Sequence, residues 1–398
     1  MTTTKNNEHK KLNVPNLRFP KFQGEWKKTK FGDIATGFDY GMNAAAKNYD
    51  GVNKYIRITD IDEASSTYTD KDIVSPDGIL TDNYLVNNRD ILLARTGAST
   101  GKSYLYKQSD GKLYYAGFLI RANVTTHDPY FVFSQLHTHR YWRWVSIMSA
   151  RSGQPGINSQ EYSSFPIYTT SIEEESKIAK LLSLLDERIA TQNKIIEDLK
   201  MLKSAIIEIE YTPNTKTTSH IGNVIEQISK RNKNNTIQNV LSVSNRQGFI
   251  KQSDQFENRN VASEDTSNYK IVEKNDFAFN PARINVGSIA RLTTFEKGII
   301  SPMYICFRTQ ENVAPEYIDF FFESKHFYCE IQKRLEGSVR QCLSFEGLCN
   351  IPFSLPSLEM QQRIGKRLFT LGQKIKTETD LLELLNKQKQ YLLRQMFI

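Results

Sequence analysis

A long internal repeat constrains the fold of this 398-residue chain more than any other feature of its sequence. Residues 157–207 align without a gap on residues 343–393, at a constant offset of 186. Apolar positions coincide throughout the two segments, and Pro166 falls on Pro352. A repeat of this length predicts two copies of one structural unit rather than a single large domain.

Upstream of these segments, the similarity between the two copies is weaker. Asp90–Arg95 resembles Asp276–Arg283 if two residues are inserted, and Lys30–Ile34 resembles His220–Val224. We therefore expect each copy to consist of a divergent block of about 150 residues followed by a better-matched block of about 40 residues.

The better-matched blocks have the periodicity of helices. Apolar residues recur at alternating spacings of four and three from Ile178 to Ile206, and again from Ile364 to Leu392, with polar residues at two matched places in each series. This is the heptad pattern of helices that pack on each other. A continuous helix over residues 172–209 would be roughly 57 Å long at 1.5 Å per residue. That is the length of a spacer rather than of an ordinary core helix.

The divergent blocks have mixed α/β patterns, in which short β-rich runs are separated by Gly, Asn and Asp turns. The predicted strands cover residues 55–59, 90–94, 114–120 and 299–307, and the predicted helices cover residues 130–148 and 317–335. Residues 211–219 contain a proline and no aliphatic side chain, which indicates a linker between the copies. The predicted fold class is α+β, with two mixed α/β heads that are each followed by a long helix.

Composition narrows the function only slightly. Lys and Arg number 52 against 44 Asp and Glu, and the resulting net charge of +8 is a modest bias toward polyanionic partners. The polar N-terminus and the absence of an apolar run of about 18 residues lead us to expect a soluble, cytoplasmic protein. The four cysteines have no zinc-binding spacing, so we expect reduced, structural thiols and no metal site. They are Cys306, Cys329, Cys342 and Cys349.

At this point the chain resembles a known family, the DNA specificity subunits of type I restriction-modification enzymes. Ile351–Ile364 is similar to the Pro-Leu-Pro, Glu-Gln and Arg-Ile opening of that family's conserved helix. Phe165–Ile178 is a degraded form that lacks the second proline and the glutamine. Gly32–Ile34 and Arg89–Gly97 also resemble family features, and the order of these features, repeated twice, makes the resemblance specific.

The resemblance implies two target recognition domains, at residues 1–170 and 212–356, and two conserved spacer helices, at residues 171–211 and 357–398. It also implies that the helices pack as an antiparallel coiled coil with a pseudo-twofold axis, and that each head reads one half of a split, asymmetric site in double-stranded DNA. A spacer of fixed length would then become part of the specificity.

The family's specificity subunit is not catalytic by itself. The resemblance implies that this chain docks two adenine-N6 methyltransferase subunits and, in the full complex, two restriction subunits. S-adenosylmethionine, ATP and Mg²⁺ would be bound by those partner subunits, and no cofactor is expected in this chain.

Sequence motifs give little support to catalysis by the chain itself. Thr96–Ser103 is similar to a phosphate-binding loop, but that motif needs four residues between its glycines and this chain has three. A turn at the end of a strand is the better interpretation. Asn280–Arg283 lacks the second proline and the aromatic residue of an amino-methyltransferase site, and no histidine lies in a metal-binding or nucleophile-activating pattern.

Basic and amide side chains near aromatic residues are the natural candidates for DNA contacts. We favour Arg95 and Arg283 because they occupy related positions in the two copies, although any one arginine could equally be a solvated surface charge. Trp142 and Trp144 are interpreted as packing residues rather than base-stacking ones. The candidates in the first copy are Arg95, Lys102, Arg151 and Gln154; those in the second are Lys251, Arg283, Arg291, Arg340 and Gln341.

Two alternatives stay open from the residues alone. One is a structural coiled-coil adaptor whose heads bind protein, and the other is an autonomous methyltransferase or ATPase. The missing motifs disfavour the second. The divergence of the heads on well-matched helices favours a reader of two different half-sites over the adaptor.

Overall fold

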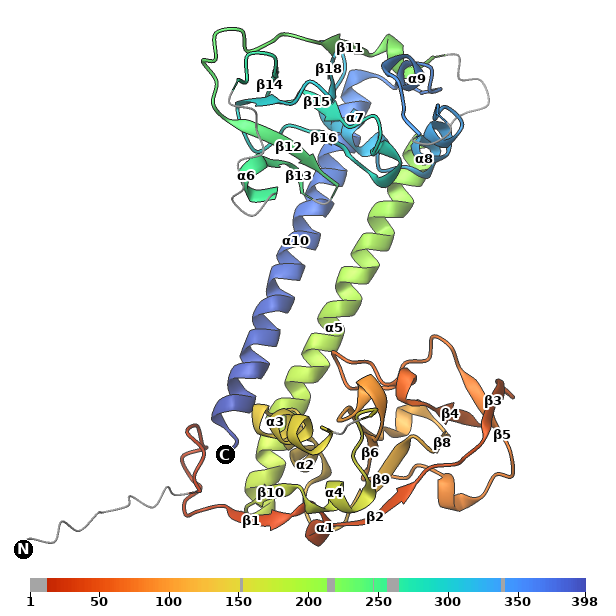
Figure 1. Cartoon of the computed structure of the whole chain (residues 1–398), viewed down its shortest axis with the longest axis vertical. Helices are drawn as coiled ribbons and strands as arrows, with labels where there is room; N and C mark the ends of the chain where they lie inside the picture. Colours follow the sequence, from red (N-terminus) through yellow and green to blue (C-terminus); the bar gives the residue numbers. More distant parts are fainter. Residues whose placement is uncertain (1–12, 151–152, 213–218, 246, 256–264, 338–340) are drawn as a thin grey trace, which may run out of the picture. The chain divides into compact units, whose positions relative to one another are not determined.

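A computed structural model describes residues 13–150, 153–212, 219–245, 247–255, 265–337 and 341–398 (Figure 1). The chain divides into two compact units. Unit 1 consists of residues 1–193 together with 381–398, and unit 2 consists of residues 194–380. We call the part of unit 1 that precedes its long helix head one, and the part of unit 2 between the two long helices head two. No helix among the described residues is long and apolar enough to cross a membrane.

Head one is built around a four-stranded antiparallel sheet with the strand order β2-β9-β6-β7. Its strands are β2 (Ala35–Tyr40), β9 (Leu119–Val124), β6 (Asp90–Ala94) and β7 (Ser103–Leu105). β6 is buried along its whole length, as a central strand rich in aliphatic residues should be. One face of the sheet packs on helices, and Val132 and Tyr141 from those helices join its core.

Smaller elements complete head one. The strand pairs are β1 (Lys27–Lys30) with β10 (Pro166–Thr169), β3 (Ala45–Asn48) with β5 (Val74–Asp77), and β4 (Lys54–Ile56) with β8 (Leu113–Tyr115). The helices are α1 (Phe31–Ile34), α2 (Pro129–Gln135), α3 (His139–Met148) and α4 (Ser159–Ser164). The 3₁₀ turns are η1 (Ile58–Asp60), η2 (Asp82–Tyr84), η3 (Gly97–Ser99) and η4 (Gln108–Asp110).

Head two repeats this plan. Its first sheet, β11-β18-β15-β16, has the same connectivity as the sheet of head one, and a second four-stranded sheet has the order β13-β12-β17-β14. The strands are β11 (Ile225–Ile228), β12 (Val240–Ser244), β13 (Gly248–Lys251), β14 (Lys270–Glu273), β15 (Phe277–Phe279), β16 (Ile289–Arg291), β17 (Lys297–Ile300) and β18 (Ile305–Thr309). The helices are α6 (Gln252–Gln255), α7 (Pro315–Phe321), α8 (Lys325–Gln332) and α9 (Phe345–Cys349), with 3₁₀ turns η5 (Ile221–Asn223) and η6 (Ile284–Val286).

The predicted α+β repeat is confirmed, with corrections at the level of single elements. Each predicted helical stretch is in fact two helices, because Thr138 and Ser324 cap new helices with their side chains. These two caps are themselves 186 residues apart. The predicted strand over 299–307 is likewise two strands, β17 and β18, with a turn between them.

The proposed insertion of two residues between Asp90 and Arg95 is wrong, because the offset of 186 holds through that segment. The amide of Ile157 donates to the carbonyl of Arg95 at 2.9 Å, and the amide of Leu343 donates to the carbonyl of Pro281 at 3.0 Å. Pro281, and not Arg283, therefore occupies the place of Arg95. The gap brought Arg95 and Arg283 into alignment. The backbone hydrogen bonds instead align the ends of the two strands, where Arg95 matches Pro281.

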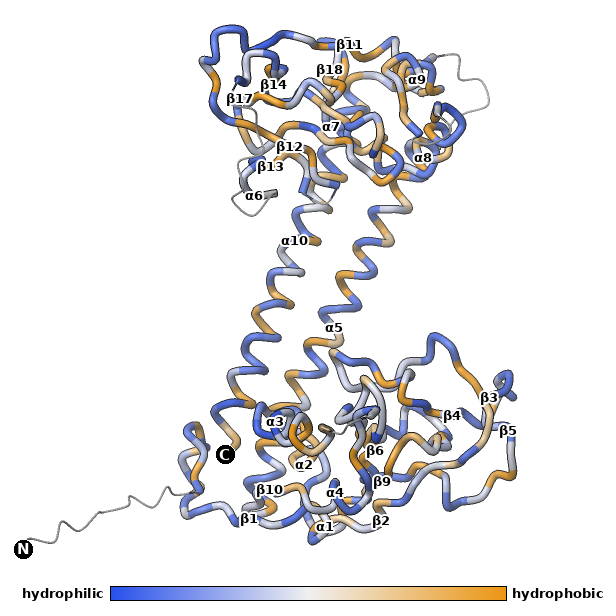
Figure 2. The backbone as a smooth tube through the Cα atoms, viewed as in Figure 1, coloured by the Kyte–Doolittle hydropathy of each residue, from blue (hydrophilic) through white to orange (hydrophobic). Residues whose placement is uncertain are grey.

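Two long helices connect the heads along the chain, and each contributes one part to each unit. They are α5 (Ile172–Tyr211) and α10 (Leu358–Gln395). Figure 2 shows hydrophobic and hydrophilic residues alternating along both, as the heptad pattern predicts.

Within unit 1 the two helices run antiparallel. Leu182 of α5 shares a buried cluster with Leu393 of α10, and one turn further along α5 the carboxylate of Asp186 pairs with Lys389 at 2.7 Å. Trp26, which is only 1% exposed, packs into the same cluster. The N-terminal part of head one thus packs against the C-terminal end of α10.

A buried residue near the start of each long helix binds the backbone of its head, and these two residues are also 186 positions apart. In unit 1, the Glu175 carboxylate accepts the amide of Asp128 at 3.1 Å and that of Thr170 at 3.0 Å, and lies 2.9 Å from Nδ1 of His127. Burial raises the pKa of Glu175. The junction in unit 1 therefore holds an acidic side chain among N–H donors.

The matching residue in unit 2 is an amide. Oε1 of Gln361 accepts the amide of Ala314 at 2.9 Å, and its Nε2 donates to the carbonyl of Pro356 at 2.9 Å. Pro356 stands where unit 1 has Thr170, and proline has no N–H to donate. The first copy lacks both the second proline and the glutamine, and these two differences go together. Thr170 has an N–H that needs the Glu175 carboxylate as its acceptor, whereas Pro356 has no N–H.

Candidate nucleic-acid interface

The loop over Thr96–Ser103 connects two antiparallel strands of head one. β6 precedes it and β7 follows it, and the loop holds only the 3₁₀ turn η3, so it does not open an α-helix as a phosphate-binding motif would require. The expected turn at the end of a strand is confirmed. Gly101 has a φ of +93°, and a Cβ atom added there would lie 2.8 Å from Val145, so both the conformation and the close packing require glycine.

A second loop of head one lies directly against this turn. The amide of Gly97 donates to the carbonyl of Pro155 at 3.0 Å, and Thr96 and Gly156 form a β-bridge. A Cβ atom added to Gly97 would lie 3.1 Å from Nε2 of Gln154. The structure thus brings Gln154, which is exposed, close to the segment that carries Arg95.

Arg95 is held in place from two sides. Its guanidinium lies over the ring of Tyr40, 4.7 Å from the ring centroid, and Nη1 donates to the carbonyl of Gly117 at 3.3 Å. The ion pairs formed between described residues do not include Arg95. Its charge is therefore preorganised by an aromatic ring and a carbonyl rather than neutralised by a carboxylate.

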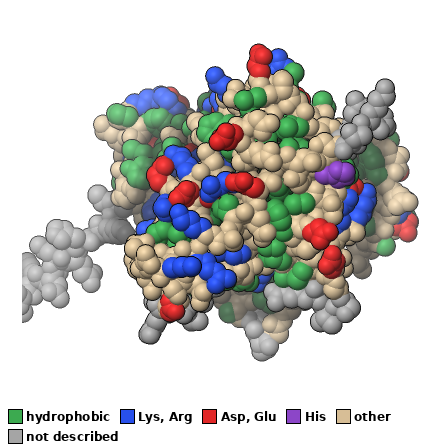
Figure 3. Space-filling view, turned by 90° about the horizontal axis from the view of Figure 1, so that it is seen from above, with side chains coloured by type: hydrophobic (Ala, Val, Ile, Leu, Met, Phe, Trp, Pro, Cys, Tyr) green, Lys and Arg blue, Asp and Glu red, His purple; other side chains and the backbone are tan. Residues whose placement is uncertain are grey.

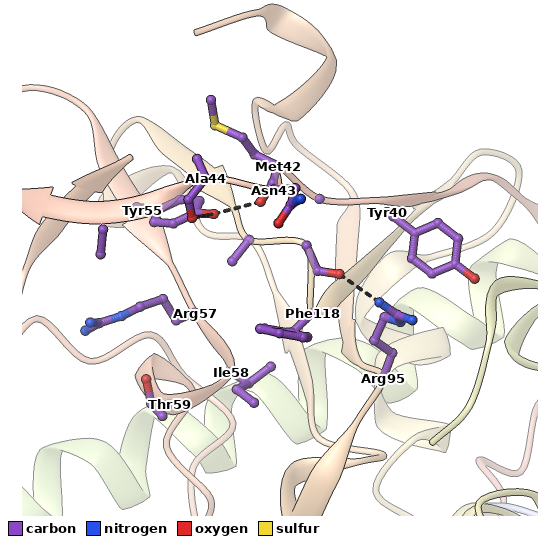
Figure 4. Close-up of a pocket in the computed structure, with 14 residues that line it drawn as sticks. Tyr40, Met42, Asn43, Ala44, Tyr55, Arg57, Ile58, Thr59, Arg95 and Phe118 are labelled. Atoms are coloured by element: carbon purple, nitrogen blue, oxygen red, sulfur yellow. Dashed lines mark hydrogen bonds between the residues drawn. The ribbon is translucent and has the colours of Figure 1, made fainter. Parts of the chain in front are cut away.

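Arg95 lies at one side of a cleft of about 610 Å³ in head one. In the view of Figure 4, Phe118 lies between Arg57 and Arg95. Phe118 is 57% exposed, although phenylalanine is usually buried. The other lining residues are Tyr40, Gly41, Met42, Asn43, Ala44, Ala46, Tyr55, Ile58, Thr59, Ala116 and Gly117.

The walls of the cleft are fixed by internal hydrogen bonds. The hydroxyl of Tyr55 donates to the carbonyl of Met42 at 2.7 Å. Arg57 is neutralised by Asp60 at 2.8 Å and by Asp72 at 3.2 Å, and its pKa is raised by these hydrogen bonds. Of the two arginines that line the cleft, Arg95 is therefore the one available to an incoming ligand.

The remaining candidates of head one have other environments. Lys102 pairs with Glu63 at 3.1 Å and has a side chain that is only 20% exposed. Trp144 packs on Tyr141 and Phe165, as expected of a packing residue, whereas Trp142 is 43% exposed. Arg151 lies outside the described residues.

One candidate in head two is a structural residue, which corrects our expectation. Arg291 has a side chain that is 8% exposed, and its guanidinium is bound by Glu316 at 2.5 Å and by Asp319 at 3.1 Å. A guanidinium already held by two carboxylates is not available to DNA. Lys251, Arg283 and Gln341 are exposed, and Arg340 lies outside the described residues.

Head two also carries a basic loop that sequence reasoning missed. Lys230, Arg231, Lys233 and Lys297 line a hollow of about 770 Å³. Asn232 is buried within the loop and bonds to the backbone of Ile237 through both side-chain atoms, which fixes the loop shape. The signal was present in the run of basic and asparagine residues from Lys230 to Asn235, but such a run is also typical of solvated loops.

Both signs of charge are interspersed on the surface. In Figure 3, Lys and Arg side chains lie mainly in the left half of the face shown, with Asp and Glu side chains among them. At the basic loop, Lys297 is paired with Glu273 at 2.9 Å, while Lys230 and Lys233 are exposed. On the face shown, attraction for a polyanion therefore depends on local groups rather than on one large patch.

The described residues contain no group of three or more His, Cys, Asp or Glu side chains placed to hold a metal ion. Cys306 is buried within its sheet, which raises its thiol pKa to about 12. A thiol of that pKa stays protonated at neutral pH and is a poor nucleophile.

Comparisons with known proteins agree with the repeated architecture. The family model described as the type I restriction modification DNA specificity domain matches residues 23–201 and again residues 207–387. The type I restriction enzyme MjaVIII specificity subunit of Methanocaldococcus jannaschii is 24% identical over 339 residues, which are 77% of this chain and 76% of that protein. The putative type I restriction enzyme MjaX specificity subunit of the same organism is 25% identical over 301 residues, covering 69% and 67%.

Solved structures share the fold. The S subunit of a type I restriction-modification system from M. genitalium superposes with a TM-score of 0.63 at 15% identity, over 97% of this chain and 99% of that one. A chain from a study of complex assembly and conformational transition of the type I system superposes with a TM-score of 0.51 at 15% identity, over 94% and 97%. Because the family model matches both copies over most of the chain, this protein belongs to the family of type I restriction-modification DNA specificity subunits.

Proposed function

We propose that this chain reads a bipartite, asymmetric DNA site, with one head on each half-site. The observation that carries the proposal is that one fold occurs twice with different surfaces at its loops. Head one presents the cleft with Arg95 and Phe118, while head two presents the basic loop. A duplicated scaffold with unlike recognition loops is suited to two unlike half-sites.

The domain division that we propose follows the helices. Residues 1–170 and 212–356 would be the reading domains, and residues 171–211 and 357–398 would be the spacers. The bounds of α5 and α10 support this division. Because each spacer helix is continuous, a change in its length would alter the tolerated gap between half-sites.

The chain would act as a non-catalytic scaffold for two methyltransferase and two restriction subunits. Exposed apolar residues on the long helices are suited to protein contacts. They include Leu181, Leu184 and Leu384 in unit 1, and Met201, Leu202, Ile209 and Phe369 in unit 2. Adenine-N6 methylation with S-adenosylmethionine, and ATP- and Mg²⁺-dependent cleavage, would belong to those partners.

The test is to co-express this chain with a candidate methyltransferase subunit in a host free of DNA methylation. N6-methyladenine is then mapped across the genome by single-molecule sequencing. We expect a split motif with a fixed gap that is methylated only when both proteins are present. A stable complex without sequence-selective DNA binding would refute the proposal.

The adaptor alternative makes the opposite prediction. Heads that bind only protein would give no salt-dependent affinity for a duplex, whereas phosphate contacts make DNA binding weaken steeply as salt rises. Exchange of one head for that of a relative should change one half-site only. A change in both half-sites would contradict modular reading.

A further inference from the structure

We propose that Arg95 is a base-reading residue of head one and that it selects a guanine in one half-site. This inference rests on the proposed function, since it requires that head one binds DNA. It goes further by naming the residue, the base and the half-site affected. The argument uses the environment of Arg95, the shape of the cleft and the difference between the heads.

The first step is that Arg95 is charged and held in position, and that no described carboxylate forms an ion pair with it. Arg57 and Arg121, which are also in head one, are paired with carboxylates at 2.8 Å and 3.3 Å. Arg95 instead has Tyr40 beneath its guanidinium plane and the Gly117 carbonyl at one nitrogen. Stacking on a ring restricts the side chain before DNA arrives, so less conformational entropy is lost on binding.

The second step is the geometry of the remaining donors. A guanidinium has five N–H groups in a planar fork, and the hydrogen bond to Gly117 uses one of them. Guanine presents two acceptors, O6 and N7, on its major-groove edge, and a bidentate arginine is the commonest specific contact to them. Adenine has a donor where guanine has O6, so the same fork discriminates against it.

The third step is the apolar surface beside Arg95. Phe118 is largely exposed and shares the cleft with Met42 and Ile58. An exposed aromatic ring next to a cation can pack against a base or a thymine methyl group and exclude water from the contact. Hydrogen bonds to a base discriminate more strongly when water cannot replace them. Phe118 would thus keep water away from the contact between Arg95 and the base (Figure 4).

The fourth step is that head two cannot make this contact. Pro281 occupies the place of Arg95, as the matched backbone hydrogen bonds show. The pairing of β18 with β15 places Met303, which has no aromatic ring, where head one has Phe118. The effect of changing Arg95 should therefore be confined to one half-site.

The experiment uses the full chain in complex with its methyltransferase subunit. Arg95→Lys keeps the charge but removes the planar fork, and Arg143→Lys changes an exposed arginine on α3 outside the cleft as a matched control. Methylation is measured on a duplex library in which each position of both half-sites is randomised. We expect the wild-type complex to require guanine at one position of one half-site. With Arg95→Lys, that preference should fall by about tenfold or more, while the other half-site keeps its sequence.

The outcomes separate the two proposals. If the wild-type complex shows no split motif, the proposed function fails and Arg95 is not at issue. If the wild type shows a motif that Arg95→Lys leaves unchanged, or if the variant weakens all sequences equally, the base-reading role is refuted. Should Arg95→Lys fail to fold in thermal unfolding, Tyr40→Leu removes the supporting ring instead. It must relax the same position, and an unchanged motif would again refute the role.

Discussion

Replacing Glu175 with glutamine should destabilise unit 1, although glutamine is the natural residue at the matching place in unit 2. The two oxygens of Glu175 accept N–H groups from Thr170 and Asp128. A glutamine has one oxygen, so its NH₂ group must face one of those donors. A buried N–H left without an acceptor costs about 1–3 kcal/mol.

Two opposing effects determine how much Glu175→Gln changes the free energy of unfolding. Because burial raises the pKa of Glu175, its ionised form is disfavoured in the folded state, and removing the charge gives back part of the loss. We therefore expect Glu175→Gln to lower the free energy of unfolding by about 1–2 kcal/mol at neutral pH. The double variant Thr170→Pro/Glu175→Gln recreates the arrangement of Pro356 and Gln361, in which the amide oxygen accepts one N–H and the NH₂ group donates to the proline carbonyl.

The double-mutant cycle tests the coupling itself. Thr170→Pro also removes the hydrogen bond from the Thr170 hydroxyl to Glu174, but this loss occurs in both proline variants and cancels in the cycle. The coupling between the two substitutions should be favourable by about 1–3 kcal/mol.

Tryptophan fluorescence during urea unfolding is a suitable assay. All three tryptophans, Trp26, Trp142 and Trp144, lie in unit 1, so the signal reports that unit alone. Gln361→Glu in unit 2 is the matched control and should leave the fluorescence transition of unit 1 in place. If Glu175→Gln is as stable as the wild type, or if the double variant merely sums the two losses, the linkage between proline and glutamine is wrong.

Three further outcomes are expected. Burial lowers the pKa of His137 to about 4. As pH falls below 6.5, the His137 imidazole is protonated in the unfolded chain but not in the folded one. The free energy of unfolding of unit 1 should therefore fall by about 1–2 kcal/mol between pH 7.5 and pH 5. His137→Gln should abolish that part of the pH dependence, and an unchanged urea midpoint profile would contradict it. Trp26→Ala should cost unit 1 about 3–5 kcal/mol, as measured by circular dichroism, and a loss below 1 kcal/mol would show that the cluster repacks. Inserting one heptad in both α5 and α10 adds about 10 Å of helix and should lengthen the gap in the methylated motif, with both half-sites kept; an unchanged gap would refute the spacer role.

Some features of the candidate site could be predicted from the sequence and others could not. Arg95 was a candidate because it is a basic residue near aromatic ones and because it seemed to match Arg283, whereas the backbone hydrogen bonds place Pro281 at its position. Arg291 looked equivalent as a cation, yet it is neutralised by two carboxylates contributed by a helix that lies 25 residues or more further along the chain. Sequence spacing carries no information about such a partner.

The sequence by itself determined the duplication, the α+β class and the two long helices. Each of these follows from local periodicity or from self-similarity, which depend only on the order of residues. The sequence also showed that the first copy lacks both the second proline and the glutamine, but it did not show why the two differences occur together. The tertiary structure decided which cations are available, where the cleft lies and which positions of the two heads are equivalent. Those depend on contacts between segments distant in the chain, and on backbone hydrogen bonds that hold even where the side chains have diverged.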